Sequence, residues 1–427
     1  MPLEDFQKDA CTRVKWAWAS GAHRVVMQIP TGGGKTFTAA HLMAQGGHRW
    51  IFAAHLDSLV SDTYERLRGA GIHAGIVAPW AKPDMKARAQ VCSIGTLTAR
   101  DLFPDADRIA VDECHRANAK ELSTWLRQYP PHVKVLGLTA TPQRGDGQPM
   151  ADIWDELVLG PSVQTLIARG MLVQPTLYCA PQGTVGDGVK ELRRRRAEWT
   201  RALYFCDTRV QARKVVVRLE EAGFRVEAMF GETPKAERDE LRARLRAGGL
   251  DVLVGCDVFV EGFDEPTVDC IVLDAPFGTV GRYLQAIGRG TRRAPGKKGV
   301  IILDLRGAVY FHGLPDEDRK WSLDGTTDGL REPGIRIATC PKCGATFRWK
   351  AFCPRCGTQI GALDKHAPPP LTKTEKLEKY EKIPLDKRKQ SWWDTMFAIY
   401  RERFKMPEAR ARKMADESVG KKFHGQT

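Results

Sequence analysis

The sequence has no apolar run long enough to cross a membrane. A membrane-spanning helix needs roughly 18 or more mostly apolar residues, and no run in the 427-residue chain approaches that length. The opening stretch, MPLEDFQKDACTRV, is too polar and acidic for a secretory signal peptide. These two absences predict a cytoplasmic protein that has no membrane partner.

The chain also lacks the cysteine pattern of a protein held together by disulfides. Seven of its eleven cysteines are scattered, and the other four form two C-P-x-C-G knuckles. In a reducing compartment, such knuckles favour a metal site over disulfides, and four thiolates suit tetrahedral Zn²⁺. We predict a structural zinc ribbon at 337–360, because bound zinc can fold a module too small to have its own core. The predicted ligands are Cys340, Cys343, Cys353 and Cys356.

The chain has fewer acidic residues than basic ones. The chain has 66 Lys and Arg against 52 Asp and Glu, which gives a net charge of +14. An excess of this size favours a polyanionic partner, most often nucleic acid, although a basic surface without such a partner is the alternative. The length is sufficient for two or three domains.

Short apolar runs alternate with amphipathic stretches in two blocks. We expect strands at 24–29, 49–54, 108–113 and 133–140 in the first block, and at 202–207, 225–230, 251–257, 270–276 and 299–305 in the second. Such runs are typical of strands buried on both faces, and their alternation with helices indicates a parallel sheet. The predicted fold class is therefore α/β, with two tandem parallel-sheet domains.

Breaks in this alternation suggest the domain boundaries. The turn-rich PQGTVGDG and the basic ELRRRRAEW indicate a hinge at 181–200 between domains at 1–180 and 201–312. A linker at 313–336 precedes the cysteine module, and 361–427 is predicted to be a basic linker followed by a helical tail. In the tail, residues 391–404 place apolar side chains on one helical face, which favours a docking helix, with a partner-binding helix as the alternative.

A glycine-rich stretch, QIPTGGGKT at 28–36, lies between the first predicted strand and a helical run. Its glycines allow the backbone N–H groups to close around phosphate oxygens, and the following helix N-terminus adds its dipole. Lys35 would reach the β and γ phosphates, and the Thr36 hydroxyl would bind Mg²⁺. Ile29 replaces the first glycine of the strict pattern, but the strand–loop–helix context still predicts a nucleotide site. The predicted contacts are Thr31, Gly32, Gly33, Gly34, Lys35 and Thr36.

The stretch IAVDECHRAN at 109–118 ends another buried strand in two carboxylates. Such strand ends line the crevice where ligands bind an open parallel sheet, and a phosphate site needs carboxylates for metal and water. We predict that Asp112 holds the Mg²⁺ shell and Glu113 polarises the attacking water. Adjacent residues on a strand end point apart, so Cys114 and His115 are not expected to form a nucleophile pair. His115 is expected to couple the nucleotide site to its surroundings.

These motifs, in this order, resemble those of superfamily 2 helicases and translocases. PTGGGKT, DECH and TAT (139–141) are followed by DVFVEGFDEP (257–266), which is similar to motif V, and by QAIGRGTRR (285–293), which is similar to motif VI. With the cysteine module, the chain resembles RadD-like helicases, in the group of XPB-like and restriction motors. The resemblance covers residues 1–310 and implies two RecA-like domains in a bacterial or phage-encoded protein.

The resemblance also implies further nucleotide contacts. Gln7 lies where related proteins place an adenine-reading glutamine, and Gly262 and Asp264 lie in the segment similar to motif V.

In the segment similar to motif VI, the spacing of three polar residues supports a catalytic role. Gln285, Arg289 and Arg292 are separated by four and three positions, so one helical face carries all three. We predict that Arg289 and Arg292 reach the γ-phosphate across a cleft, with Gln285 among the nucleotide contacts. The second sheet has no phosphate loop, so one ATP site is expected between the domains.

The family's strand-contacting motifs Ia, Ib and IV resemble AAHLDSL, SIGTLT and CDTRVQA. The resulting candidates for nucleic-acid contact are His55, Gly95, Thr96, Thr208 and Arg209. Small polar groups and helix N-termini can hold backbone phosphates without reading bases. Ordinary helix capping is an equally good interpretation of Thr96 and Thr208.

Apolar and basic residues alternate between the two cysteine knuckles. Phe347, Trp349 and Ala351 alternate with Arg348 and Lys350, which predicts one apolar and one basic face of a hairpin. Stacking on nucleic-acid bases is one interpretation. Packing of Trp349 against the helicase body is the other.

Taken together, the motifs predict an ATP-dependent DNA helicase or translocase that acts in repair, recombination or replication. Its cofactors would be ATP, Mg²⁺ and Zn²⁺. Single-stranded, forked or branched DNA is expected in preference to RNA, and the tail is a possible contact for a protein partner. The alternatives are an RNA helicase, a restriction-type motor subunit, and a nucleic-acid-binding ATPase that is not a motor.

Overall fold

The protein is represented by a computed structural model, which describes residues 3–55, 57–116, 119–260, 262–325 and 336–361, together with Glu408, Arg412 and Asp416. The chain divides into two compact units, residues 1–362 and 363–427. In the second unit the three described residues are helical, and Arg412 pairs with Glu408 at 2.8 Å. The predicted linker at 366–390 and the predicted helix at 391–404 lie outside the described residues.

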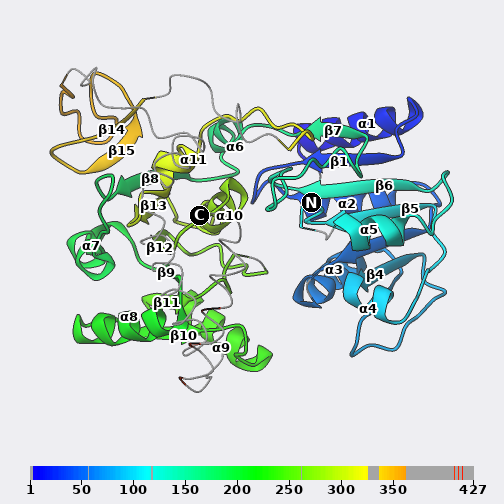
Figure 1. Cartoon of the computed structure of the whole chain (residues 1–427), viewed down its shortest axis with the longest axis horizontal. Coiled ribbons are helices and arrows are strands. Elements are labelled where there is room, and N and C mark those ends of the chain that lie inside the picture. Colours follow the sequence, from blue (N-terminus) through cyan, green and yellow to red (C-terminus); the bar gives the residue numbers. More distant parts are fainter. Residues whose placement is uncertain are drawn as a thin grey trace. The chain divides into compact units, whose positions relative to one another are not determined.

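The first unit contains two parallel α/β lobes (Figure 1). Lobe 1, residues 3–172, has a seven-stranded sheet in the order β3-β4-β2-β5-β6-β1-β7, and all of its strand pairs are parallel. Its strands are β1 (Arg24–Gln28), β2 (Trp50–Ala54), β3 (Ala74–Val77), β4 (Ala89–Ser93), β5 (Arg108–Asp112), β6 (Lys134–Thr139) and β7 (Glu156–Leu159). Its helices are α1 (Asp5–Ala19), α2 (Lys35–Ala44), α3 (Asp57–Gly69), α4 (Ile94–Ala99), α5 (Ala119–Leu126) and α6 (Val163–Ala168).

Lobe 2, residues 173–312, carries the second sheet, in the order β10-β11-β9-β12-β13-β8-β15-β14. Its strands are β8 (Gln174–Cys179), β9 (Ala202–Cys206), β10 (Val226–Met229), β11 (Val252–Gly255), β12 (Cys270–Asp274) and β13 (Gly299–Asp304). Its helices are α7 (Gly188–Arg194), η1 (Arg196–Glu198), α8 (Arg209–Glu221), α9 (Lys235–Arg246), α10 (Val280–Gly288) and α11 (Ala308–His312). The remaining two strands, β14 (Ile337–Thr339) and β15 (Ala345–Arg348), belong to the cysteine module and pair antiparallel.

Each sheet is covered on both faces, as its apolar strands require. In lobe 1, one core packs α1, α2 and α3 against the sheet, and the other packs α4 and α5. In lobe 2, α7 and α8 cover one face, whereas α9, α10 and α11 cover the other. The α/β fold class and all the strands expected from the sequence are confirmed, with ends that shift by up to two residues. In the described ranges, no helix is both long enough and apolar enough to span a bilayer.

The boundary between the lobes differs from the prediction. Strand β8 pairs in parallel with β13, from Gln174 opposite Gly299 to Cys179 opposite Asp304, so it belongs to lobe 2. The chain crosses between Leu172, which packs in a core of lobe 1, and Val173, which packs against a core of lobe 2. The predicted first domain, 1–180, is therefore too long, because strand pairing rather than local turn content determines where a sheet begins.

The segment at 181–200, predicted to be a hinge, is packed onto lobe 2. Val189, Leu192 and Trp199 are buried in its core. Arg195 is only 5% exposed, and its guanidinium lies 3.1 Å from the centre of the Tyr178 ring. The run of arginines is thus partly structural, which corrects the hinge interpretation.

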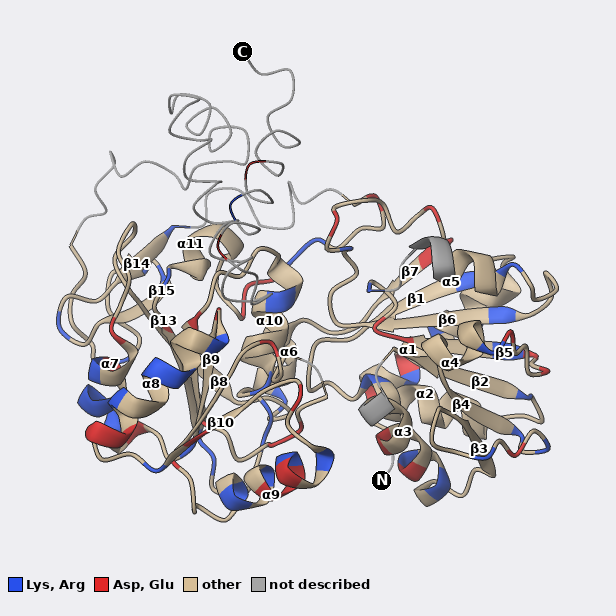
Figure 2. Ribbon diagram, turned by 60° about the horizontal axis from the view of Figure 1, so that its bottom comes forward, with Lys and Arg blue, Asp and Glu red and all other residues tan. Residues whose placement is uncertain are grey.

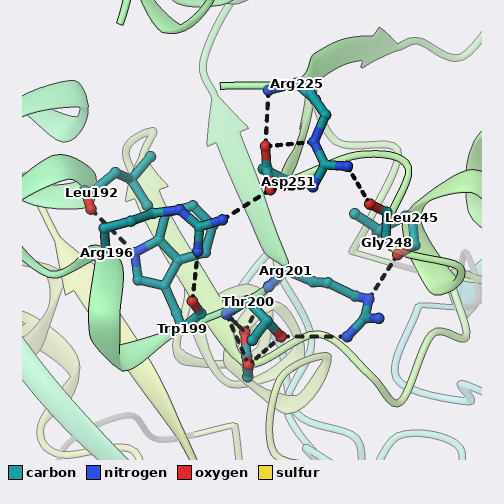
Figure 3. Close-up of polar contacts among 10 residues, drawn as sticks. Leu192, Arg196, Trp199, Thr200, Arg201, Arg225, Leu245, Gly248 and Asp251 are labelled. Atoms are coloured by element: carbon teal, nitrogen blue, oxygen red, sulfur yellow. Dashed lines mark hydrogen bonds and ion pairs between the residues drawn. The ribbon is translucent and has the colours of Figure 1, made fainter. Parts of the chain in front are cut away.

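Arg196 and Trp199 take part in a polar network at the amino ends of the strands of lobe 2 (Figure 3). The Asp251 carboxylate accepts hydrogen bonds from Arg196 at 3.0 Å and from the backbone and side chain of Arg225 at 2.7–3.0 Å. Beside it, Asp269 accepts from the backbone N–H groups of Thr200 and Arg201. These bonds fix the segment that leads into β9, so this region is a rigid part of lobe 2.

After α11 the chain returns to lobe 1. Residues 313–325 run back to the loop that precedes β7, where the Leu323 carbonyl accepts from the N–H groups of Met150 at 2.7 Å and Ala151 at 3.0 Å. Leu323 packs against a core of lobe 1, and Leu314 packs in a core of lobe 2. Within the described residues, the backbone passes between the lobes at 172–173 and again in this returning segment.

Candidate active site

The glycine-rich loop lies at the carboxyl end of β1 and opens into α2. Gly34 is the N-cap of α2, has φ of +86°, and leaves the helix without a side-chain cap. Gly33 lies so close to Ile29 that an added Cβ would be 2.6 Å from its side chain. An N-terminus that no side chain caps leaves its N–H groups and its dipole to an anion, so the loop can hold phosphate.

Gln7 braces this loop from α1. Its side chain is buried, its Nε2 donates to the Gly33 carbonyl at 3.1 Å, and its Oε1 accepts from the Glu4 N–H at 3.0 Å. A Cβ added at Gly34 would lie 2.6 Å from the Gln7 amide nitrogen. The structure therefore gives Gln7 a supporting contact with the phosphate loop, and its reading of adenine stays a prediction.

The two carboxylates follow β5, as expected. Asp112 is its last residue, and its Oδ1 accepts from the backbone N–H of Glu113 at 3.0 Å. Glu113 has φ of +46°, a strained conformation for a residue with a side chain, and such strain is typical of functional sites. Burial would raise the pKa of Glu113, but the nearby Lys35, His115 and Arg289 lower it overall, so the carboxylate is charged at neutral pH.

His115 links this motif to the next strand of the sheet. Its Nδ1 lies 2.8 Å from the Thr139 hydroxyl and 3.4 Å from Glu113 Oε2. The Thr139 oxygen also accepts from the Thr141 N–H at 3.0 Å. Burial lowers the pKa of His115 to about 4, so the imidazole is neutral at pH 7. Cys114 packs in a core of lobe 1, where its sulfur would lie 2.7 Å from a Cβ added at Gly137, and burial raises the pKa of its thiol, which disfavours a nucleophilic thiolate.

A cavity of about 290 Å³ brings residues of the two lobes together. Lobe 1 contributes the phosphate loop with Lys35 and Thr36, and the carboxylates Asp112 and Glu113. Lobe 2 contributes Gly262, Asp264, Arg289 and Arg292. The hydroxyl of Thr36 and the carboxylate of Asp112 are the hard oxygen ligands that Mg²⁺ prefers, and the cations suit a triphosphate.

Helix α10 ends at Gly288, so Arg292 lies in the turn beyond it, which corrects the prediction that one helical face carries Gln285, Arg289 and Arg292. Both arginines are positioned by contacts within lobe 2. Arg289 Nη1 donates to the Phe263 carbonyl at 2.9 Å. Arg292 forms an ion pair with Asp264, which also faces Arg66 of α3 at 3.3 Å. Asp264 is therefore shared between a cation of each lobe.

Two close approaches bring α10 against the site of lobe 1. The buried Gln285 donates from Nε2 to Glu113 Oε2 at 3.3 Å. A Cβ added at Gly288 would lie 2.6 Å from Thr31 of the phosphate loop. Only glycine at position 288 allows this approach.

The sequence reasoning missed Arg66 and the wall of the cavity formed by α3. That wall includes Leu59, Asp62 and Thr63. These residues carry no motif of their own, because their role depends on α3 lying against the cleft. The serine and threonine content of α3 gives no signal that would have found them.

The four predicted zinc ligands lie together. Their sulfurs are all within 4.8 Å of one another, with Cys340 and Cys356 at 3.6 Å and Cys343 and Cys353 at 3.7 Å. Four thiolates around a tetrahedral Zn²⁺ are expected about 3.8 Å apart, given Zn–S bonds of about 2.3 Å. Hydrogen bonds from the side chain and backbone of Thr358 lower the pKa of Cys356 to about 6, which favours the thiolate that a metal needs. The cluster fits a zinc ion.

The hairpin between the knuckles only partly follows the predicted alternation. Phe347 lies on β15 and packs against a core of lobe 2, next to the pairing of β15 with β8. Trp349 and Ala351 follow the end of the strand, and Trp349 is 38% exposed. The module therefore extends the sheet of lobe 2, and Phe347 rather than Trp349 makes the packing contact.

The candidates for nucleic-acid contact lie at the carboxyl ends of β2, β4 and β9. His55 follows β2, and Gly95 is exposed in the first turn of α4. Thr96 is buried inside α4, whose N-cap is Ser93, so it is not a helix cap. Thr208 caps α8, and Arg209 pairs with Glu232 at 2.7 Å. In the ribbon of Figure 2, blue segments on α7 and α8 mark Lys and Arg residues of these helices of lobe 2.

A strand–loop–helix phosphate cradle, facing an arginine-bearing helix across a cleft between two parallel sheets, defines a RecA-like motor ATPase. Residues 1–144 match the family model of the type III restriction enzyme res subunit, and residues 187–294 match the helicase conserved C-terminal domain. These two matches, in this order, support a superfamily 2 helicase of the restriction-motor group and a nucleic-acid-dependent ATPase, an activity that implies ATP and Mg²⁺.

Two curated relatives span different shares of their own length. The 51.5 kDa protein of Lactococcus phage (isolate 7-9) is 26% identical over 394 residues, which cover 84% of this chain and 83% of the relative. The putative mitochondrial ATP-dependent helicase irc3 of Schizosaccharomyces pombe is 25% identical over 347 residues, which cover 71% of this chain but only 57% of the relative. The chain thus matches little more than half of the yeast protein.

Solved structures share the fold at low sequence identity. A fragment of a putative HsdR subunit of a type I restriction enzyme from Vibrio vulnificus has a TM-score of 0.60 at 18% identity, over 76% of this chain and 67% of that one. The type ISP restriction-modification enzyme LlaBIII, bound to DNA, has a TM-score of 0.54 at 17% identity, over 72% and 28%. Dbp5 of Saccharomyces cerevisiae, bound to RNA and ADP BeF3, has a TM-score of 0.51 at 18% identity, over 74% and 93%.

Proposed function

We propose that this protein is an ATP-driven motor that translocates on DNA or remodels it, in repair, recombination or replication. The observation that carries the proposal is the cavity of about 290 Å³ that holds the phosphate loop, with Lys35 on the wall from lobe 1 and Arg289 and Arg292 on the wall from lobe 2. A ligand held by both lobes favours their closure, and its hydrolysis releases them. Repeated closure and opening over a bound strand would produce a step.

In this proposal each residue of the cavity has its own role in binding or hydrolysing ATP. Lys35 and the N–H groups of the phosphate loop bind the triphosphate, while Thr36 and Asp112 hold the metal ion. Bound Mg²⁺ would neutralise charge that develops on the phosphates. Glu113 orients the attacking water and accepts its proton, because its carboxylate is charged and lies in the same cavity. Arg289 and Arg292 stabilise the charge on the transferred phosphoryl group.

Gln285 completes the link between the lobes. Its amide contacts Glu113, the residue that positions water, so opening or closing of the cleft changes the hydrogen bonding of Glu113. His115 and Thr139 carry the same contact on to Thr141. We propose that this chain of contacts couples hydrolysis to the movement of the lobes.

DNA is favoured over RNA because the family model that matches residues 1–144, and two of the solved structures that share the fold, come from restriction enzymes. Dbp5, bound to RNA, shares the fold and keeps the RNA-helicase alternative open to test. Zinc in the cysteine module is part of the same proposal, with Cys340, Cys343, Cys353 and Cys356 as its ligands. RadD-like membership rests on the motifs alone. The proposed contact of the tail with a protein lies outside the described residues.

The deciding experiment is the rate of ATP hydrolysis with single-stranded DNA, forked DNA, blunt duplex or RNA, all at one salt concentration because phosphate contacts are salt-dependent. We expect stimulation by DNA, and stronger stimulation by single-stranded and forked forms than by blunt duplex, since the cleft needs an accessible strand. Stimulation by RNA alone would select the RNA-helicase alternative. The same rate with every polymer and with none would select the non-motor ATPase.

A further inference from the structure

Lobe 1 carries an exposed tryptophan that belongs to none of the helicase motifs. Trp80 follows β3 by three residues and is 53% exposed. A single exposed apolar side chain is ordinary on a protein surface. What matters for Trp80 is where it lies, how its loop is held and which charges surround it.

The register of the strands places Trp80 on the side of the sheet formed by the carboxyl ends of its strands, where nucleic-acid contacts are predicted. Val77, the last residue of β3, pairs with Cys92, one residue before β4 ends at Ser93. Strand β2 ends level with β4, and the three strands are parallel, so their carboxyl ends lie side by side about 4.8 Å apart per strand. Trp80 therefore extends the row of residues formed by the candidates that follow β2 and β4.

The loop that carries Trp80 is held in place by backbone and side-chain contacts. The Ala81 N–H donates to the Ala78 carbonyl at 3.2 Å, which closes a turn around Trp80. The Gln90 amide donates to the carbonyls of Asp84 at 2.7 Å and Ala87 at 3.1 Å. A loop that is fixed before binding loses little conformational freedom when a ligand arrives.

Basic side chains flank the indole. Arg100, at the end of α4, donates from Nη2 to the Pro79 carbonyl at 3.5 Å, which brings its exposed guanidinium next to Trp80. Lys82 is exposed two residues further along the loop. The acidic side chain of this loop, Asp84, faces His73 at 3.4 Å. The surroundings of Trp80 thus combine an aromatic face with positive charge.

We propose that Trp80 stacks on a base of the bound DNA strand, and that Arg100 and Lys82 hold the phosphates beside that base. Every base has a π face, so stacking on tryptophan is tolerant of sequence, and phosphate contacts do not read sequence either. A motor that steps along DNA needs contacts that hold the strand whatever its sequence. The proposal rests on the proposed function and extends the predicted strand path by one strand of the sheet, from β4 to β3.

The test is equilibrium binding of the full-length protein to a single-stranded DNA oligonucleotide at fixed salt without nucleotide. Trp80→Ala should weaken binding by about tenfold, the order expected for one stacked base, and Trp80→Phe should restore part of the loss. An oligonucleotide of the same length with abasic sites throughout offers no base to stack on, so wild type and Trp80→Ala should bind it equally. Basal ATP turnover of Trp80→Ala should remain unchanged.

Trp16 provides the matched control. It is 72% exposed in the last turn of α1, which leads into the amino end of β1. Trp16 therefore lies on the side of the same sheet formed by the amino ends of its strands. Trp16→Ala should bind the oligonucleotide as wild type does. Arg100→Ala should reduce the slope of log affinity against log salt by about 0.7, the value for one phosphate contact on a single strand, whereas Trp80→Ala should leave that slope unchanged.

Binding by Trp80→Ala equal to that of wild type would overturn this proposal and leave the proposed function standing. An equal loss on normal and abasic oligonucleotides would also overturn it, because that loss would not come from stacking. If wild type binds no DNA and its ATP turnover does not respond to DNA, the proposed function fails and this proposal fails with it.

Discussion

The helix that follows β1 in lobe 1 and the helix that follows β9 in lobe 2 have opposite kinds of N-terminus. In lobe 1, α2 begins at Gly34, and no side chain caps it. In lobe 2, α8 begins at Thr208, whose hydroxyl accepts from the Gln211 N–H at 3.1 Å, while the Gln211 side chain accepts from the Asp207 N–H at 2.9 Å. The first helix leaves its N-terminus to an outside anion, and the second satisfies its own N–H groups.

This difference explains how two similar sheets can share one nucleotide. Lobe 1 provides an open, glycine-lined helix end together with Lys35, so it suits the phosphates. Lobe 2 provides the arginines of α10 and the turn after it, so it suits the charge that develops on them. An ATPase with this division needs both lobes, and the variants below test each lobe in turn.

The largest effect is expected in lobe 1. Lys35→Ala should reduce ATP turnover by at least about 10³-fold, because a preorganised positive charge at the phosphates is lost from a water-poor site. Lys15→Ala, an exposed lysine of α1, is the control and should keep full turnover. Glu113→Gln should still bind ATP but fail to cleave it, as measured by nucleotide retention on the purified protein. Turnover in Lys35→Ala near that of wild type would contradict the assignment of the phosphate site.

A comparable loss is expected from lobe 2 if its arginines act across the cleft. Arg292→Ala should lower turnover by about 10³-fold, the lower bound for an arginine finger, with little change in nucleotide affinity. Arg293 is the matched control, since it is the next residue and is exposed outside the cavity. Near-normal turnover in Arg292→Ala with Arg289 intact would transfer the catalytic role to another cation.

The cysteine module extends the sheet of lobe 2 only, so its loss should affect the two lobes unequally. Elemental analysis of protein prepared without chelator should find one Zn²⁺ per chain. The double variant Cys340→Ser, Cys343→Ser should lose the metal and expose the amides of 337–360 to hydrogen exchange. Nucleotide binding at the cavity should stay within about twofold of wild type, because no cysteine of the module lines it. A wild-type protein free of zinc would contradict the metal assignment.

The network in Figure 3 gives lobe 2 a pH dependence that can be measured. Hydrogen bonds from Arg225, first among its partners, lower the pKa of Asp251. A lowered folded pKa stabilises the protein above the unfolded value of about 3.9 and loses that contribution as pH falls through the folded pKa. Asp251→Asn should therefore reduce the free energy of unfolding by about 1.5 kcal/mol at pH 7. The difference from wild type should shrink below about pH 4, and a constant difference down to pH 2 would contradict a charge effect.

The smallest effect is expected at the capped N-terminus of α8. Thr208→Ala should reduce the free energy of unfolding by about 1 kcal/mol, the usual contribution of a threonine N-cap. ATP turnover without nucleic acid should not change, since Thr208 is outside the cavity. Thr12→Ala, on an exposed turn of α1, should alter stability by less than about 0.5 kcal/mol in the same denaturant titration.

Much of the nucleotide site was predictable because its motifs are short and local. QIPTGGGKT and DECH each begin at the end of one strand, so residue type and spacing alone predict where their side chains gather. QAIGRGTRR runs past the end of α10 at Gly288, so the helical spacing was right for its residues up to that point and wrong for Arg292. The longer apolar strands were predictable for the same reason. Strands β3, β7 and β8 were missed, and length alone does not explain this, because β10 and β11 are as short as β3 and β7 and were predicted.

The errors came from contacts between residues far apart in the sequence. β8 was assigned to the first domain although it pairs with β13, and the arginine run was interpreted as a hinge although Arg195 stacks on Tyr178. No local pattern reveals that Asp264 faces Arg66, 198 residues away. These features depend on how helices and strands pack, which a local reading does not contain.

The sequence alone determined the chemistry available to this protein. Residue type and spacing along short stretches of the chain set the phosphate loop, the paired carboxylates, Arg289 and Arg292, and the four cysteines. Only the tertiary structure decided which of these groups meet. The parallel sheets bring strand ends from distant positions to one edge, the glycine at 288 lets α10 approach Thr31, and the crossing at 172–173 joins the lobes. The physical reason is that spacing fixes direction within an element, whereas distance between elements is fixed by burial and packing.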